Sequence, residues 1–259
     1  MSRLPTVFVS HGSPMTLIDP SHPGAAIAGL GKALAKPKAI LVASAHWLTN
    51  IPAASTAERP ETIHDFYGFP DELYRMTYPA PGAPALAGRA AGLLKAAGIP
   101  AGTADYGLDH GAWSPLKLMF PDADVPTAQL SIQPEQDPAH HFRVGQALAP
   151  LRDEGVLVLG SGQFTHNFRD IDRRAGNGEI APWAKDFVDW VNARIAERDF
   201  PALLDYRRQA PNAARAHPTD EHFLPLFVAL GAAAETAKID HLDFGVTGGT
   251  LAWDSYLMH

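Results

Sequence analysis

Ile40-Leu41-Val42-Ala43-Ser44-Ala45-His46 is a short apolar stretch that ends in a histidine. Val7-Phe8-Val9-Ser10-His11 has the same form, and Val156-Leu157-Val158-Leu159-Gly160-Ser161-Gly162 leads to His166. Each stretch predicts a buried β-strand, because it is continuously apolar and rich in β-branched residues. Ligands of an open α/β sheet bind beyond the carboxyl ends of its strands. The three stretches therefore predict a site lined by imidazoles at one edge of a sheet.

Strand and helix patterns alternate along the chain on either side of these stretches. Predicted strands cover residues 6–10, 38–45, 101–104, 125–132 and 156–160, with one or two closing strands within 241–257. Predicted helices cover residues 24–35, 84–97, 112–119, 138–152, 180–197, 199–207 and 219–234. Residues 50–83 are rich in Pro, Gly and aromatic residues and predict an inserted loop with short strands. The order predicts an α/β fold, a single domain over residues 1–259 with a central, mainly parallel sheet flanked by helices and an active site at the strand carboxyl ends.

The composition restricts the chemistry. The net charge of -7 argues against a nucleic-acid partner. The absence of cysteine excludes disulfides, thiolate ligands and a cysteine nucleophile, so a metal would need His and carboxylate ligands, which suit divalent iron, zinc or manganese. The N-terminus lacks the apolar region of a signal peptide, and no apolar stretch has transmembrane length. We expect a cytoplasmic protein with no membrane partner.

His11 and His46 are candidate metal ligands, because they occupy equivalent strand ends and Gly12 allows close backbone approach. The alternative is a pair of core or loop histidines bonded to backbone carbonyls. His217 and His222 open a predicted helix with Thr219 as its N-cap. They are five residues apart, about 140° around a helix, so at most one can be a ligand. His222 is favoured because a helix N-terminus disfavours imidazolium; the alternative is a surface helix start.

His166 follows a Gly160-Ser161-Gly162 turn that completes neither a phosphate-loop pattern nor a nucleophile elbow. A general acid/base role, or a place behind the ligands, suits it better. His110 lies in a loop beside Gly111. The aromatic segment 64–70 predicts either a flat pocket or a hydrophobic plug. His140 and His141 are expected to be solvated at a helix start.

Six segments in order resemble the class III extradiol ring-cleavage dioxygenases, in the DOPA-dioxygenase-like branch related to the catalytic subunit of protocatechuate 4,5-dioxygenase. The matching segments are Phe8-Val9-Ser10-His11-Gly12-Ser13-Pro14, Ser44-Ala45-His46-Trp47, Asp65-Phe66-Tyr67-Gly68-Phe69-Pro70, Leu108-Asp109-His110-Gly111-Ala112-Trp113, Gly160-Ser161-Gly162 with His166-Asn167, and Glu221-His222-Phe223-Leu224-Pro225-Leu226. Each motif is weak alone, but six in sequence over nearly the whole chain are specific.

The resemblance implies a non-haem Fe(II) site held by His11, His46 and His222, with Glu221 as an alternative ligand. It implies that His166 is the acid/base group and that His110 contacts the substrate. The implied reaction opens a catechol-type ring, DOPA-like or related, with O2. Phe66, Tyr67, Phe69 and Trp113 are the candidate residues that sandwich the planar ring.

Two other functions fit the same residues. Three histidines and a water also form a catalytic zinc site, so a zinc-dependent hydrolase is one alternative. Zinc binds such ligands more tightly than Fe(II), so it could also occupy the purified dioxygenase. A non-catalytic metal-binding protein of the same fold is the other alternative. The sequence leaves the substrate and the oligomeric state open.

Overall fold

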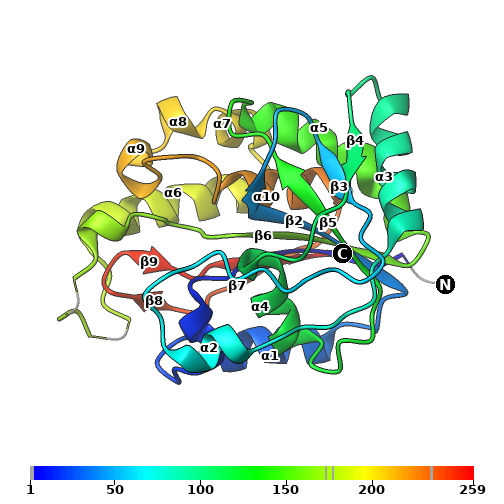
Figure 1. Ribbon diagram of the computed structural model, residues 1–259. Coiled ribbons are helices and arrows are strands. Elements are labelled where there is room, and N and C mark those ends of the chain that lie inside the picture. Colours follow the sequence, from blue (N-terminus) through cyan, green and yellow to red (C-terminus); the bar gives the residue numbers. More distant parts are fainter. Residues whose placement is uncertain (1–2, 173, 177, 234–235) are drawn as a thin grey trace.

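The computed structural model describes residues 3–172, 174–176, 178–233 and 236–259, and an eight-stranded sheet runs through its centre (Figure 1). The strand order is β4-β3-β5-β2-β6-β1-β10-β7. The four strands β5 (Thr127–Ile132), β2 (Ala39–Leu48), β6 (Val156–Gly162) and β1 (Thr6–Ser10) run parallel to one another. Their carboxyl ends therefore meet at one edge of the sheet.

Antiparallel pairings attach the outer strands. On one side β3 (Ala53–Ser55) pairs antiparallel with β5, and β4 (Gly102–Ala104) pairs parallel with β3. On the other side β10 (Ser255–Met258) pairs antiparallel with β1, and β7 (Ile239–Leu242) with β10. A separate two-stranded sheet joins β8 (Val246–Thr247) to β9 (Leu251–Ala252).

Helices cover both faces of the sheet (Figure 1). One face carries α3 (Pro84–Ala96), α5 (Pro138–Leu148), α6 (Pro182–Glu197) and α10 (Leu224–Ala232). The short helices α7 (Phe200–Leu204), α8 (Tyr206–Gln209) and α9 (Ala213–Ala216) lie beside them. The other face carries α1 (Gly24–Ala33), α2 (Asp71–Arg75) and α4 (His110–Met119). Short 3-10 helices lie at Pro14–Leu17, Ala149–Arg152 and Phe168–Asp170.

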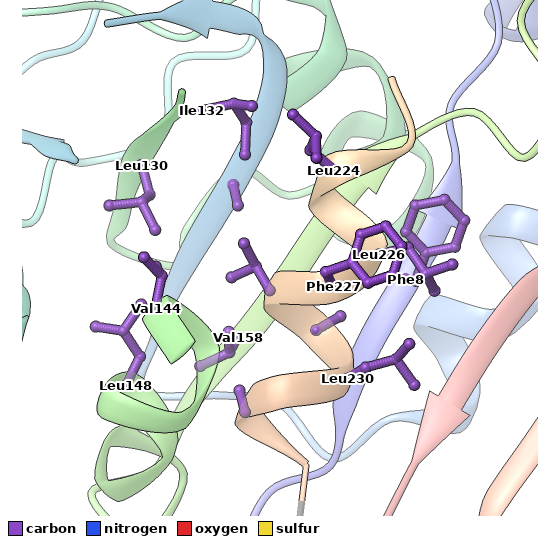
Figure 2. Packing of buried hydrophobic residues seen from close by; sticks show 14 of the residues in the cluster. Phe8, Leu130, Ile132, Val144, Leu148, Val158, Leu224, Leu226, Phe227 and Leu230 are labelled. Carbon is purple, nitrogen blue, oxygen red and sulfur yellow. The ribbon is translucent and has the colours of Figure 1, made fainter. Parts of the chain in front are cut away.

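Alternate side chains of the central strands divide the core into two clusters. Val7 and Val9 of β1 face α1 and α4, whereas Phe8 faces the cluster of α5 and α10. Figure 2 shows Leu226, Phe227 and Leu230 of α10 packed beside Phe8 and Val158. Helices α5 and α10 approach closely because both have glycine at the contact: a Cβ on Gly145 would lie 2.1 Å from the Val228 carbonyl oxygen. This packing fixes the position of the segment that precedes α10.

The α/β fold class and the mainly parallel sheet are confirmed. The predicted helix over 138–152 is α5 followed by a 3-10 turn, and the predicted helix over 199–207 is the two short helices α7 and α8. The predicted helix over 219–234 is shorter, Leu224–Ala232, and residue 234 lies outside the described residues. The prediction of a solvated His141 was wrong, since its side chain is fully buried. No helix in the described part of the chain is long and apolar enough to cross a bilayer.

Candidate metal centre

His11 follows β1 directly and is buried. The chain turns sharply behind it at Gly12, whose φ of +63° lies in the left-handed region. A Cβ at this position would also lie 1.7 Å from the indole ring of Trp253. Glycine therefore allows the backbone to turn under the buried Trp253 and to direct His11 along the edge of the sheet.

His46 lies within β2 rather than after it, so the predicted strand end at residue 45 was wrong. The register between β2 and β5 shifts between Ala43 and Leu48, and pairing resumes at Leu48 with Ile132. Trp47 stays in the strand and stacks on Tyr106, with ring centroids 4.3 Å apart. The irregularity places His46 at the site while the strand continues past it.

His222 lies in a turn before α10, so its predicted place in the first turn of a helix was wrong. The helix begins at Leu224 with Pro225 in its first turn, where proline is favoured because its missing N–H is not needed. Thr219 does not cap the helix; its hydroxyl donates to Glu221 Oε1 at 2.9 Å. Burial is the largest cause that lowers the pKa of His222, followed by the neighbouring imidazoles.

Contacts with the end of β6 and with Arg207 hold the turn that carries His222 in place. Gln163 N–H donates to the His222 carbonyl at 2.8 Å, and a Cβ on Gly162 would lie 2.1 Å from that oxygen. Arg207 donates to the His217 carbonyl at 2.6 Å and pairs with Asp220. His217 itself is buried away from the other histidines' ligand atoms, and its Nε2–H donates to the Phe164 carbonyl at 2.9 Å.

The Nε2 atoms of three histidines converge at this edge of the sheet. His11 Nε2 lies 3.1 Å from His46 Nε2, and His222 Nε2 lies 3.2 Å from the same atom. All three ligand atoms lie within 4.8 Å of one another. Metal–nitrogen bonds of about 2.0–2.1 Å, at angles of about 90–109°, place neighbouring ligand atoms about 2.8–3.4 Å apart. The spacing therefore fits a single divalent ion bound by three imidazoles.

The Nδ1 atom of each of these rings faces an oxygen. His11 Nδ1 lies 3.0 Å from Ser161 Oγ, and that hydroxyl donates to the Gly111 carbonyl, so it can accept from His11. His46 Nδ1 lies 3.2 Å from Asp65 Oδ2, and His222 Nδ1 lies 3.3 Å from Glu221 Oε1. Acceptors at Nδ1 favour the tautomer that keeps the proton there and leaves a lone pair on Nε2. Three convergent lone pairs repel one another, and a cation between them removes that repulsion.

Asp65 is a site residue that sequence reasoning did not identify. Besides its contact with His46, its Oδ1 lies 2.9 Å from His110 Nδ1 and accepts the His110 backbone N–H at 2.8 Å. Burial would raise its pKa, but the neighbouring His110 and His46 side chains hold the pKa of Asp65 well below its usual range. The sequence signal available was a carboxylate inside a loop of aromatic residues.

A buried polar layer supports the N-terminus of α4 behind His46. Asp109 caps this helix by accepting from Ala112 N–H, and it also accepts from the Ser44 hydroxyl at 2.6 Å and from the Gln129 amide. Burial raises the pKa of Asp109, opposed by these contacts. A Cβ on Gly111 would lie 2.6 Å from His46 Cδ2, so the first turn of α4 can approach the histidines only with glycine at this position.

His166 stacks face to face on His222, with ring centroids 3.5 Å apart and planes at 10°. Its backbone N–H donates to the Ala216 carbonyl at 2.9 Å, which fixes the loop after β6. Burial lowers its pKa to about 4, opposed by the nearby Glu221. The ring is therefore neutral near pH 7 and stands beside the convergent histidines.

Three of the four predicted aromatic residues lie together, with Phe69 and Trp113 beside Phe66. Its ring lies 5.3 Å from Phe69, 6.4 Å from Trp113 and 5.7 Å from His110, measured between centroids. Trp113 has no exposed surface, and its indole N–H donates to the Ile63 carbonyl, so it supports Phe66 from behind. Tyr67 is 88% exposed. Of the four, Phe66 is the one whose ring contacts His110.

Comparison with known proteins places this chain in a family. Residues 5–252 match the family described as the catalytic LigB subunit of aromatic ring-opening dioxygenase. The chain is 44% identical over 256 residues to a 4,5-DOPA dioxygenase extradiol of Beta vulgaris, which covers 97% of this chain and 95% of that protein. A 4,5-DOPA dioxygenase extradiol of Escherichia coli strain K12 is 41% identical over 234 residues, 89% of this chain and 86% of that protein.

A solved structure shares the fold. The crystal structure of an uncharacterized protein from Escherichia coli K12 superposes with a TM-score of 0.82 at 34% sequence identity. The match covers 99% of this chain and 100% of that one. The similarity therefore extends over the whole sheet and both helical layers.

Proposed function

The chain belongs to the LigB family of aromatic ring-opening dioxygenases, and from this premise we propose that it is an Fe(II)-dependent extradiol dioxygenase acting on a catechol with O2. The observation that carries the proposal is the convergence of three Nε2 atoms, in which those of His11 and His222 lie 3.1 and 3.2 Å from that of His46. We propose these three residues as the metal ligands. Glu221 faces His222 Nδ1 at 3.3 Å, and we assign it to orient that ring rather than to bind the metal.

A bound divalent iron supplies a Lewis acid that acidifies the diol hydroxyls and a redox centre for dioxygen. The three ligands are neutral imidazoles, so they leave the full positive charge of the ion uncompensated. An anionic catecholate is therefore a better fit to this site than a neutral aromatic ring. The same charge argument favours an ortho-diol, whose two oxygens can both approach the ion.

His166 is the group we propose to accept and return the proton. Its pKa of about 4 keeps the ring neutral, so it has a free nitrogen to accept a proton from an acidified hydroxyl. Stacking on His222 fixes the plane of its ring next to a proposed ligand. A positioned base of this kind contributes about 10²–10⁴-fold to a rate.

His110 is the second group that we propose to act on the substrate. Asp65 faces its Nδ1 at 2.9 Å, which leaves Nε2 as the nitrogen available for a hydrogen bond to substrate or dioxygen. Phe66 lies beside His110 and provides an aromatic wall. Tyr67 and Phe69 follow in the same loop, and we place them at the rim of the substrate site, with Trp113 supporting Phe66.

Oxygen uptake tests the proposal. Protein reconstituted anaerobically with Fe(II) should consume one O2 per catechol on addition of DOPA, caffeate or catechol, and a yellow ring-opened product should form. Hydroquinone, the para isomer, is the matched control and should not be consumed, because its oxygens cannot both reach one ion. Absence of uptake with every ortho-diol would refute the proposal.

The zinc form distinguishes the hydrolase alternative. Zinc is redox-inert, so zinc-loaded protein should neither consume O2 nor open catechols. A hydrolase would instead be active with zinc on esters or amides and would not depend on O2. Metal analysis of each preparation, measured together with both activities, connects the bound ion to the reaction.

A further inference from the structure

Asp65 contacts two histidines with different proposed roles. Its Oδ2 faces His46 Nδ1 at 3.2 Å, and its Oδ1 faces His110 Nδ1 at 2.9 Å. We propose that Asp65 is a positioning residue that fixes the metal-binding tautomer of His46 and holds the His110 side chain in a fixed position relative to His46. The inference rests on the proposed function, because it assumes that His46 Nε2 binds the metal.

The tautomer of His46 follows from which atom faces Asp65. When His46 carries its proton on Nδ1, the positive end of that N–H lies 3.2 Å from a carboxylate oxygen, and Nε2 keeps the lone pair that a metal needs. In the other tautomer a lone pair on Nδ1 faces a negative oxygen, and Nε2 carries a proton that blocks coordination. Asp65 therefore disfavours the form of His46 that cannot bind.

The backbone of α4 prevents the carboxylate from turning. Asp65 Oδ1 accepts the His110 backbone N–H at 2.8 Å, and this donor cannot change its role as an imidazole can. Oδ1 is thus committed to the helix N-terminus and Oδ2 to His46. The ring centroids of His46 and His110 lie 4.0 Å apart, and one carboxylate faces the Nδ1 atoms of both rings.

This arrangement predicts that Asp65→Asn weakens metal binding more than Asp65→Ala does. In Asp65→Asn the amide oxygen stays with the His110 backbone N–H, so the amide NH2 faces His46 Nδ1 as donor against donor. His46 escapes the clash by moving its proton to Nε2, and this proton opposes metal binding. In Asp65→Ala the His46 ring faces neither the carboxylate that favours a proton on Nδ1 nor the amide NH2 that opposes one. A role limited to holding the loop predicts the reverse order, because Asn preserves the shape and the backbone hydrogen bond.

Zinc affinity provides a readout that is separate from turnover. Zn²⁺ titrated against a chromophoric chelator should bind Asp65→Ala about 10-fold more weakly than wild type, and Asp65→Asn about 100-fold more weakly. Glu221→Gln is the matched control. It also removes a negative charge facing a ligand Nδ1, but no contact of Glu221 in the described chain involves a backbone N–H, so its amide can turn its oxygen to the ring. We expect its affinity to fall only severalfold.

Three results separate the possible failures. Equal or tighter binding by Asp65→Asn than by Asp65→Ala overturns the inference. Wild-type protein that binds no zinc refutes the proposed metal site instead. If Asp65→Asn does not fold, ¹⁵N chemical shifts of His46 in metal-free wild type decide the question: a proton on Nδ1 supports the inference, and a proton on Nε2 overturns it.

Discussion

At the scale of the residue, His166 differs from the three convergent histidines because it stacks on one of them without sharing their centre. We therefore expect His166→Ala to keep one metal per chain while its kcat falls by about 10²–10⁴-fold. Metal analysis and oxygen uptake on the same sample measure both quantities. His140→Ala, at a half-buried histidine on α5, is the control that should change neither. Loss of the metal from His166→Ala would show that His166 is a ligand.

His141 gives a prediction about pH and stability. Its Nδ1–H donates to the Asp137 carbonyl at 3.0 Å, and its Nε2 accepts the Gln133 N–H at 3.2 Å, so only the neutral ring satisfies both contacts. Burial lowers its pKa to about 4. A histidine whose folded pKa lies below its unfolded value of about 6.5 contributes full stability above pH 6.5 and loses it as the pH falls toward 4.

The loss at His141 is about 3 kcal/mol between those two pH values, at 1.36 kcal/mol for each pKa unit. Urea unfolding of wild type and His141→Gln from pH 8 to pH 4.5 measures it. The difference between the unfolding free energies of the two proteins should shrink as the pH falls. Only the wild type has the His141 imidazole, which binds a proton more readily in the unfolded state than in the folded state. Parallel curves over this range would contradict the prediction.

Single residues also show which parts of the site the sequence could predict. His11 and His46 were recognisable because each follows an apolar strand pattern that fixes its place in a sheet. Asp65 was not, because its importance arises from a contact with His110, 45 residues away, made by a loop without periodic pattern. Trp113 shows the same limit, since the sequence identifies an aromatic residue but does not predict that its ring is fully buried.

At the scale of the element, β6 and the turn before α10 depend on Gly162. Gly162→Ala puts a Cβ 2.1 Å from the His222 carbonyl and pushes that turn outward. We expect a loss of about 1–3 kcal/mol in the free energy of unfolding, as for other overpacked sites, together with weaker metal binding. Denaturant unfolding and zinc titration measure the two effects.

Gly92→Ala is the control for that substitution. Gly92 is exposed on α3, and no heavy atom lies within 4 Å of the position its Cβ would take. Alanine in a helix interior is favoured over glycine by about 0.5–1 kcal/mol, so this variant should be slightly more stable with unchanged zinc affinity. Equal effects of the two substitutions would mean that the close contact at Gly162 does not hold His222 in place.

Elements were predicted well where one local signal decided them. The β1 pattern predicted the observed Thr6–Ser10. The α3 pattern, with Pro84 as its first residue and Gly98 after it, predicted residues 84–97, close to the observed Pro84–Ala96. The start of α10 was missed because Thr219 looked like an N-cap, whereas Pro225 and the packing of the turn against β6 set the start at Leu224. The continuation of β2 past His46 was missed because tertiary pairing with Ile132 overrode the polar residue.

At the scale of the whole molecule, the site lies where both helical layers meet the edge of the sheet. His11 directly follows strand β1, and His46 lies in β2. His222 comes from the layer of α10, and His110 comes from the layer of α4. The candidate ligand His46 is separated from His11 by 35 residues and from His222 by 176. An unfolded chain cannot hold these three imidazoles together, so a metal bound by all of them selects the folded state.

Metal removal should therefore lower the thermal stability of the entire fold. An ion that binds only the native state at 100 times its Kd adds about 2.7 kcal/mol. For a chain of this size that corresponds to about 5–10 °C in Tm. Differential scanning calorimetry with and without a chelator should show this shift for wild type and almost none for His46→Ala, whose metal-free Tm serves as the baseline. A similar chelator effect in both proteins would place the stabilising ion elsewhere in the molecule, because His46 faces both of the other proposed ligands.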